Sequence, residues 1–248
     1  MAVKKVRILP EDAREYTEQD WLVYGVVPNP KTRDKLLALT VEEMVKYGPA
    51  SFNANKVCDR IDAKHALVNY YFGNKEMLIA EASVLSYRQS VIEHKANILA
   101  APRDPEKRLR AFLNGELERH RRMGGWAILV SYPILSAESR SLIQQHFGEQ
   151  LETYFQYYLA MVGTLILDLR NGTLSDFDFD ENTIPKSKLL KNPKVVMDGI
   201  SLVWSAHGLN VWSAGQQLGS ANLEDPNFTQ KMLIKHHIDN LVELAKGK

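Results

Sequence analysis

The fold of this chain is decided by one stretch, residues 32–82, which reads TRDKLLALTVEEMVKYGPASFNANKVCDRIDAKHALVNYYFGNKEMLIAEA. From Thr32 onward, apolar residues recur at three- and four-residue spacing, as they do in a helix that buries one face. Gly48 follows where the C-terminal cap of that helix belongs. The stretch therefore opens with a helix of about four turns.

A short second helix is expected next. Asn53 is a residue type that caps helix N-termini well. Phe52 before it and Val57 after it stand at the spacing of a hydrophobic staple. We expect this helix to run to about Ile61.

A turn over residues 62–64 separates the second helix from a third, expected at residues 65–72. Gly73 closes the third helix, and Asn74 caps the one that follows. Two short helices joined by a turn of three or four residues form a helix-turn-helix, whose second helix is sized to enter the major groove of DNA.

The rest of the chain is also helical in pattern and contains no convincing strand. Helices are expected at residues 74–99, 104–122, 125–135, 138–169, 193–218 and 226–246, with a polar connection at 170–192. The predicted fold is all-α, with a three-helix helix-turn-helix head and a helical-bundle body for ligand binding and dimerisation. The predicted domains are an arm (1–30), the head (31–78) and the body (79–248).

Composition narrows the class of protein. The chain has 248 residues, 45% of them hydrophobic, and a net charge of +1, so any nucleic-acid binding must come from a local patch. Between Lys31 and Lys75 there are eight basic and five acidic side chains. No signal peptide and no run of about 18 apolar residues is present, and Cys58 is the only cysteine. These features predict a cytoplasmic protein without a membrane span.

The stretch from Thr32 to about Ala82 resembles the DNA-binding domain of the TetR (tetracycline-repressor) family. The resemblance rests on the threonine-arginine start, Gly48, the run VNYYFGNKE at residues 68–76, and Leu78. Four positions depart from the family pattern. Asp62 stands where the turn usually has glycine, Asn69 where the third helix often has tyrosine, and Phe52-Asn53 where two threonines often begin the second helix.

The resemblance implies which residues face DNA. They are Asn53, Asn55, Lys64, His65, Ala66, Asn69, Tyr70 and Lys75. Of these, Lys75 would contact phosphate, whereas Tyr71 and Phe72 belong to the core of the head. The alternative for this face is an ordinary solvated helix surface. The basic N-terminal arm could also track phosphates, or it could simply pack against the protein.

The body carries many large amphipathic rings. The proposed ligand contacts are Trp126, Tyr132, Tyr154, Trp204 and His207. Together such residues suit an apolar pocket with a few polar contacts, although each alone could be ordinary core. The last two long helices are expected to form a two-fold dimer interface, because two heads are needed to read two DNA half-sites.

Metal, cofactor and enzymatic signatures are not predicted. Asp176, Asp178, Asp180 and Asn182 resemble the start of a calcium loop, but Glu181 stands where that loop needs glycine. The chain has no GxSxG, HExxH, P-loop or CxxC sequence. We therefore predict that it is not an enzyme, needs no cofactor and binds no metal.

The sequence thus predicts a homodimeric, sequence-specific DNA-binding regulator of transcription. Its partners would be a double-stranded DNA operator and a small apolar or aromatic effector that releases a repressor from that operator. The alternative is a regulator of the same kind that is controlled by a protein partner or acts as an activator, without sensing a small molecule.

Overall fold

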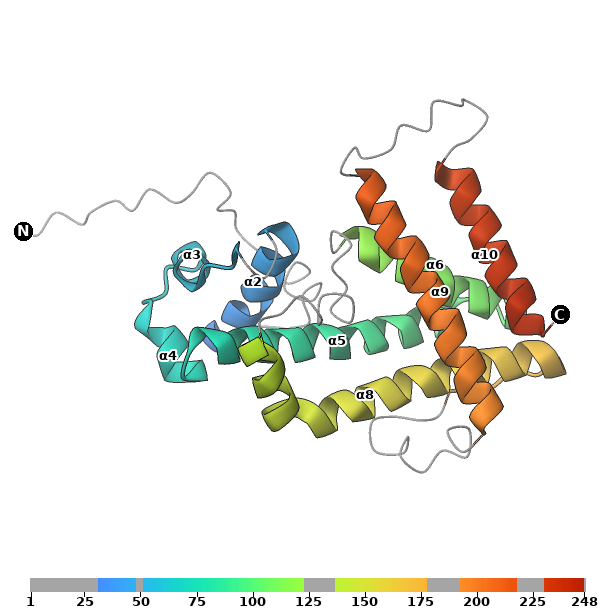
Figure 1. Cartoon of the computed structure of the whole chain (residues 1–248), viewed down its shortest axis with the longest axis horizontal. Coiled ribbons are helices and arrows are strands. Elements are labelled where there is room, and N and C mark those ends of the chain that lie inside the picture. Colours follow the sequence, from blue (N-terminus) through green and yellow to red (C-terminus); the bar gives the residue numbers. More distant parts are fainter. Residues whose placement is uncertain (1–30, 48–50, 123–136, 178–191, 218–229, 248) are drawn as a thin grey trace, which may run out of the picture. The chain divides into compact units, whose positions relative to one another are not determined.

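The computed structural model describes residues 31–47, 51–122, 137–177, 192–217 and 230–247. Within these ranges all regular secondary structure is helical (Figure 1). The helices are α2 (Thr32–Tyr47), α3 (Ala54–Arg60), α4 (Ala66–Phe72), α5 (Lys75–Ala100), α6 (Pro105–Arg122), α8 (Ala137–Asn171), α9 (Pro193–Gln217) and α10 (Gln230–Lys246). The prediction of an all-α fold is confirmed.

Residue contacts divide the chain into two compact units. Unit 1 comprises residues 1–86 and 134–146, and unit 2 comprises residues 87–133 and 147–248. Helices α5 and α8 therefore each contribute one end to unit 1 and the remainder to unit 2. The domain boundary predicted after residue 78 stays a prediction.

Unit 1 is built on α2, which buries an almost continuous apolar surface. Its fully buried side chains include Leu36 and Leu39, and each such side chain contributes roughly 1.5–3 kcal/mol of hydrophobic free energy. Helix α3 packs on α2. Arg60 of α3 and Glu42 of α2 form an ion pair of 2.7 Å between the two helices, and the Arg60 side chain is only 5% exposed. Cys58 is buried in α3, as predicted.

Unit 2 contains α6, α9 and α10 packed on one another. Helix α6 buries a stripe at helical spacing, made of Leu109, Phe112, Leu113, Glu116 and Leu117. Helices α9 and α10 run antiparallel (Figure 1). This is the helical-bundle packing expected of the body.

An ion-pair network joins α10 to α6. Arg110 donates to Glu106 at 2.9 Å and to Asp239 at 2.6 Å, and Lys246 lies 3.1 Å from Glu106. Hydrogen bonds from Arg110 and then Lys235 hold the pKa of Asp239 below its ordinary value. A carboxylate with a lowered pKa stabilises the folded state at neutral pH, and that contribution is lost as the pH falls through the lowered value. Because these groups are partly exposed, the contribution is small.

Four predicted body helices correspond to α5, α6, α8 and α9 within two residues at each end. The expected last helix begins at Gln230 in the structure, and residues 226–229 lie outside the described residues. The predictions for the arm (1–30), for Gly48 and for the helix at 125–135 also lie outside them. Along the described ranges, no helix is both long enough and apolar enough to cross a membrane.

Candidate nucleic-acid interface

The turn between α3 and α4 has the hydrogen bonds of a Schellman motif. The N–H of Ala63 donates to the carbonyl of Cys58 at 2.9 Å, and the N–H of Asp62 donates to that of Asp59 at 3.3 Å. This motif needs a left-handed residue after the helix, and Asp62 adopts it with a φ of 51°. Asp tolerates this conformation better than most residues. The departure from the family's glycine therefore leaves the turn intact.

The N-terminus of α3 is capped as predicted. The Oδ1 of Asn53 accepts from the backbone N–H of Asn55 at 3.0 Å and of Lys56 at 3.4 Å. Phe52 and Val57, the pair at staple spacing, are 3% and 0% exposed. The cap thus anchors α3 while Asn53 and Asn55 stay at the surface.

Helix α4 has one buried and one exposed face. Val68 and Phe72 are buried in the head. The side chains predicted to meet DNA are all exposed, from the turn through the helix: Lys64, His65, Ala66, Asn69 and Tyr70. Tyr70 has 78% of its surface exposed. With seven residues, α4 is about 10 Å long. The diameter of an α-helix with its side chains, about 10–12 Å, matches the width of about 12 Å of a major groove.

His65 is held against α3. Its Nε2 lies 2.9 Å from Oδ1 of Asp59, and both side chains are partly exposed. Because this bond joins α3 to the start of α4, it fixes the direction of the imidazole at the exposed end of the turn.

The α4–α5 connection places Lys75. Gly73 ends α4 with a φ of 80°, and Oδ1 of Asn74 accepts from the N–H of Met77 at 2.7 Å. Both residues have the capping roles that the sequence predicts. Lys75 is the first residue of α5 and is exposed, with its ammonium 5.6 Å from the centroid of the Phe52 ring.

Arg33 of α2 contacts the C-terminal end of α4 and the side of α5. Its guanidinium lies 5.0 Å from the centroid of the Phe72 ring and bonds Oε1 of Glu81 at 2.5 Å. One side chain of α2 thereby contacts both α4 and α5, which helps to hold α4 in place behind its exposed face.

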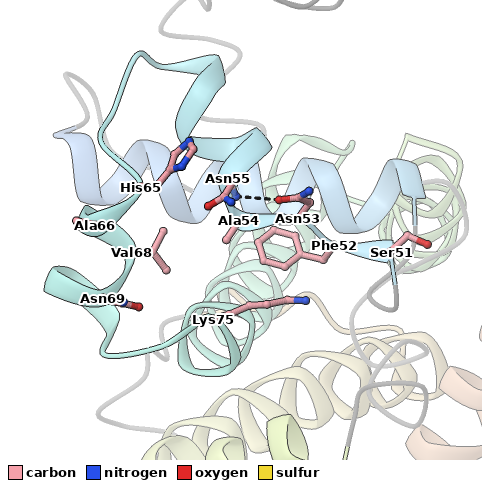
Figure 2. Close-up of a pocket in the computed structure, with 10 residues that line it drawn as sticks. All are labelled: Ser51, Phe52, Asn53, Ala54, Asn55, His65, Ala66, Val68, Asn69 and Lys75. Atoms are coloured by element: carbon pink, nitrogen blue, oxygen red, sulfur yellow. Dashed lines mark hydrogen bonds between the residues drawn. The ribbon is translucent and has the colours of Figure 1, made fainter.

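The starts of α3, α4 and α5 line an open hollow of about 650 Å³ in unit 1. Figure 2 shows it between the start of α3, the start of α4 and Lys75. Six of the eight residues predicted to face DNA line it, namely Asn53, Asn55, His65, Ala66, Asn69 and Lys75. Its described lining has one lysine, three asparagine amides and no carboxylate, a set that can donate hydrogen bonds to phosphates and base edges. Lys64 and Tyr70 are exposed outside the hollow.

The ligand contacts predicted in the body are not brought together by the described structure. Tyr154 is buried in α8, whereas Trp204 on α9 is 67% exposed. His207 lies in α9, but its side chain is outside the described part, and Trp126 and Tyr132 lie outside the described residues altogether. The predicted effector pocket therefore stays a prediction.

Two features were missed at the level of sequence. The hollow is also lined by Ser51, Phe52, Ala54 and Val68. A buried polar cluster in unit 2 joins His94, Glu116 and Tyr158. The signal for the cluster was available, because His94 and Glu116 interrupt the apolar stripes of their helices. Among the described residues, no group of three or more His, Cys, Asp or Glu side chains is arranged to hold a metal ion.

No model of a known protein family matches the chain, and no curated protein matches it. Its structure is similar to that of a TetR transcriptional regulator from Legionella pneumophila, with 12% identity, a TM-score of 0.55, and coverage of 86% of this chain and 98% of that one.

Two further solved structures are similar. A candidate transcriptional regulator from Pseudomonas aeruginosa PAO1 is 17% identical, with a TM-score of 0.54 and coverage of 89% of this chain and 94% of that one. A TetR-like transcriptional regulator from Rhodococcus sp. RHA1 is 16% identical, with a TM-score of 0.51 and coverage of 87% and 95%. The chain has the TetR-like all-helical fold, and the resemblance seen in the sequence is confirmed at the level of the fold.

Proposed function

We propose that this protein is a sequence-specific DNA-binding regulator of transcription that acts as a homodimer. The proposal depends chiefly on one observation: a seven-residue helix, buried on one side and held by capped turns, exposes Asn69 and Tyr70 beside a carboxylate-free hollow. That arrangement suits a recognition helix in the major groove with polar side chains at the adjacent backbone.

The exposed residues divide by chemistry into two groups. An asparagine amide can make two hydrogen bonds to one adenine, accepting from N6 and donating to N7. Such a bidentate contact is worth about 1–3 kcal/mol of discrimination against the wrong base. Asn69, which is exposed on α4, would take that role. Lys75 would hold the protein on phosphates, whereas Lys64 would lie at the groove, where a lysine ammonium can bond a phosphate or a guanine base edge.

The homodimer is supported by apolar side chains left exposed on the last two helices. On α9, Met197 and Trp204 are 64% and 67% exposed and share one face at seven-residue spacing. On α10, Met232 and Leu244 are 57% and 48% exposed. Several large exposed apolar residues on two packed helices favour an interaction surface there, and a second copy of the chain would supply the second head that paired half-sites require.

The proposed mode of action is repression relieved by a small apolar or aromatic effector. Helix α5 begins in unit 1 beside α4 and continues into unit 2. An effector that favours one arrangement of unit 2 would therefore act on the heads through a continuous helix. It can shift that equilibrium only by its difference in affinity for the two states, for which about 1–3 kcal/mol is a reasonable coupling.

Replacing Lys75 by glutamine should weaken binding to every DNA sequence alike, because a phosphate contact is lost. The slope of log affinity against log salt should become shallower by about two, since each lost contact is worth about 0.9 and a dimer loses two. The measurement is fluorescence anisotropy over a salt series, with DNA from upstream of the protein's own gene.

The matched control is Lys107→Gln, which removes the same charge from an exposed position on α6 in unit 2. Its salt slope should equal that of the unchanged protein. If both variants shift the slope equally, or neither does, Lys75 does not contact DNA.

A further inference from the structure

Unit 2 has a polar cluster inside its apolar core. His94 from α5, Glu116 from α6 and Tyr158 from α8 are 1%, 2% and 1% exposed. The Oε1 of Glu116 accepts a hydrogen bond from the hydroxyl of Tyr158 at 2.5 Å and lies 2.5 Å from Nε2 of His94. Its Oε2 lies 3.6 Å from Nδ1 of His120. The carboxylate is thus fixed by side chains from three helices.

Two buried polar atoms beside this cluster have no hydrogen-bond partner within the described part of the chain. They are the hydroxyl of Tyr87, a residue 3% exposed, and Nδ1 of His94. The two residues are seven apart on α5 and therefore lie on one face of it. Buried polar groups nearly always have a partner, and an unpaired one costs stability. A partner from outside the chain would explain why both are present.

Aromatic rings pack against the side chains of both residues. The ring centroid of Tyr154 lies 6.5 Å from that of Tyr87 in an edge-to-face arrangement. The rings of Phe112 and Tyr158 lie 5.2 Å and 5.8 Å from the imidazole of His94. The surroundings therefore suit a ring compound more than a flexible polar one.

The hydrogen-bonding character of the two atoms follows from their neighbours. Burial, and then the negative charges of Glu116 and Glu152, raise the pKa of Tyr87, so its phenol stays protonated and donates. Because Oε1 of Glu116 accepts, the contact fits the tautomer of His94 that carries its proton on Nε2, and in that tautomer Nδ1 presents a lone pair. A complementary molecule needs an acceptor for Tyr87 and a donor for His94.

We propose that Tyr87 and His94 are the polar contacts of the effector site, and that the effector is an uncharged ring compound with an amide-like acceptor and donor. This inference rests on the proposed function, because it names the ligand of that regulator. An anionic ligand is disfavoured, since it would meet the same carboxylate charge that acts on the phenol.

The experiment uses the full-length protein and a matched pair of probes, benzamide and benzoate, which share size and ring but differ in charge. Benzamide at millimolar concentration should raise the melting temperature, and benzoate should not. In Tyr87→Phe, affinity for benzamide measured by calorimetry should fall by about tenfold, as expected for one lost hydrogen bond to a buried donor.

The matched structural control is Tyr158→Phe, which removes an equivalent hydroxyl that does have a partner. Without probe, Tyr158→Phe should lower the melting temperature by roughly 3–10 °C, whereas Tyr87→Phe should leave it unchanged or higher. The inference is overturned if Tyr87→Phe melts as low as Tyr158→Phe. It is also overturned if benzamide fails to bind the unchanged protein, or if benzoate binds as well as benzamide.

DNA binding is measured separately, without probe. Tyr87→Phe should bind the operator as the unchanged protein does. If neither the unchanged protein nor Tyr87→Phe binds DNA, while benzamide still binds, the proposed function is contradicted and the ligand site stands. If the unchanged protein binds DNA but does not bind benzamide, the ligand site is contradicted and the proposed function stands.

Discussion

Replacing Trp204 by glutamate should convert the proposed dimer to a monomer and lower its affinity for operator DNA by roughly a hundredfold or more. The indole is 67% exposed on α9, in line with Met197. If the partner covers it, a carboxylate at this position would be buried without a counter-charge, which costs several kcal/mol in each protomer. A single head reads too few base pairs to bind tightly by itself. Sedimentation gives the oligomeric state, and anisotropy gives the affinity.

The control is Ile92→Glu, which places the same charge on an exposed apolar residue of a different helix. Ile92 is 42% exposed on α5. This variant should stay dimeric and bind DNA normally. A Trp204→Glu protein that sediments as a dimer would exclude α9 as the interface.

Replacing Glu116 by alanine should lower the free energy of unfolding of the protein by about 3–5 kcal/mol. The change leaves the Tyr158 hydroxyl and Nε2 of His94 without their shared acceptor in the core, and it opens a cavity as well. Thermal and urea unfolding measure the loss.

Glu118→Ala is the matched control, two residues further along α6 on its exposed face. It should change stability by less than about 0.5 kcal/mol. Glu116→Gln, which keeps one acceptor oxygen, should fall between the two. Equal stabilities for the three variants would show that the buried cluster contributes nothing to the fold.

The sequence was most informative where local chemistry decides the structure. Asn53, Gly73 and Asn74 were predicted as caps, and each has its capping geometry or hydrogen bond in the structure. These interactions span at most three residues, so their partners could be predicted from spacing alone. Asp62, at the turn position where the resemblance places glycine, likewise adopts a positive φ of 51°.

The body was harder to predict because its important contacts join distant helices. His94 and Glu116 are 22 residues apart, and Tyr158 lies 42 residues beyond Glu116. Helical periodicity shows which face of a helix is apolar, but it does not show which neighbour covers that face. The sequence therefore does not show what covers Trp204, whose indole is 67% exposed in the structure, and its assignment to an effector pocket stays a prediction.

The most direct test of DNA binding is a footprint of the unmodified protein on DNA from upstream of its own gene, at low salt and without effector. We expect one protected site with two symmetric half-sites, whose centres are separated by about 10 base pairs or a multiple of that spacing. Protection should disappear when the salt concentration is raised. A uniform cleavage pattern, with no protected site at any protein concentration below the one that saturates non-specific DNA, would contradict the proposal that this protein is a DNA-binding regulator.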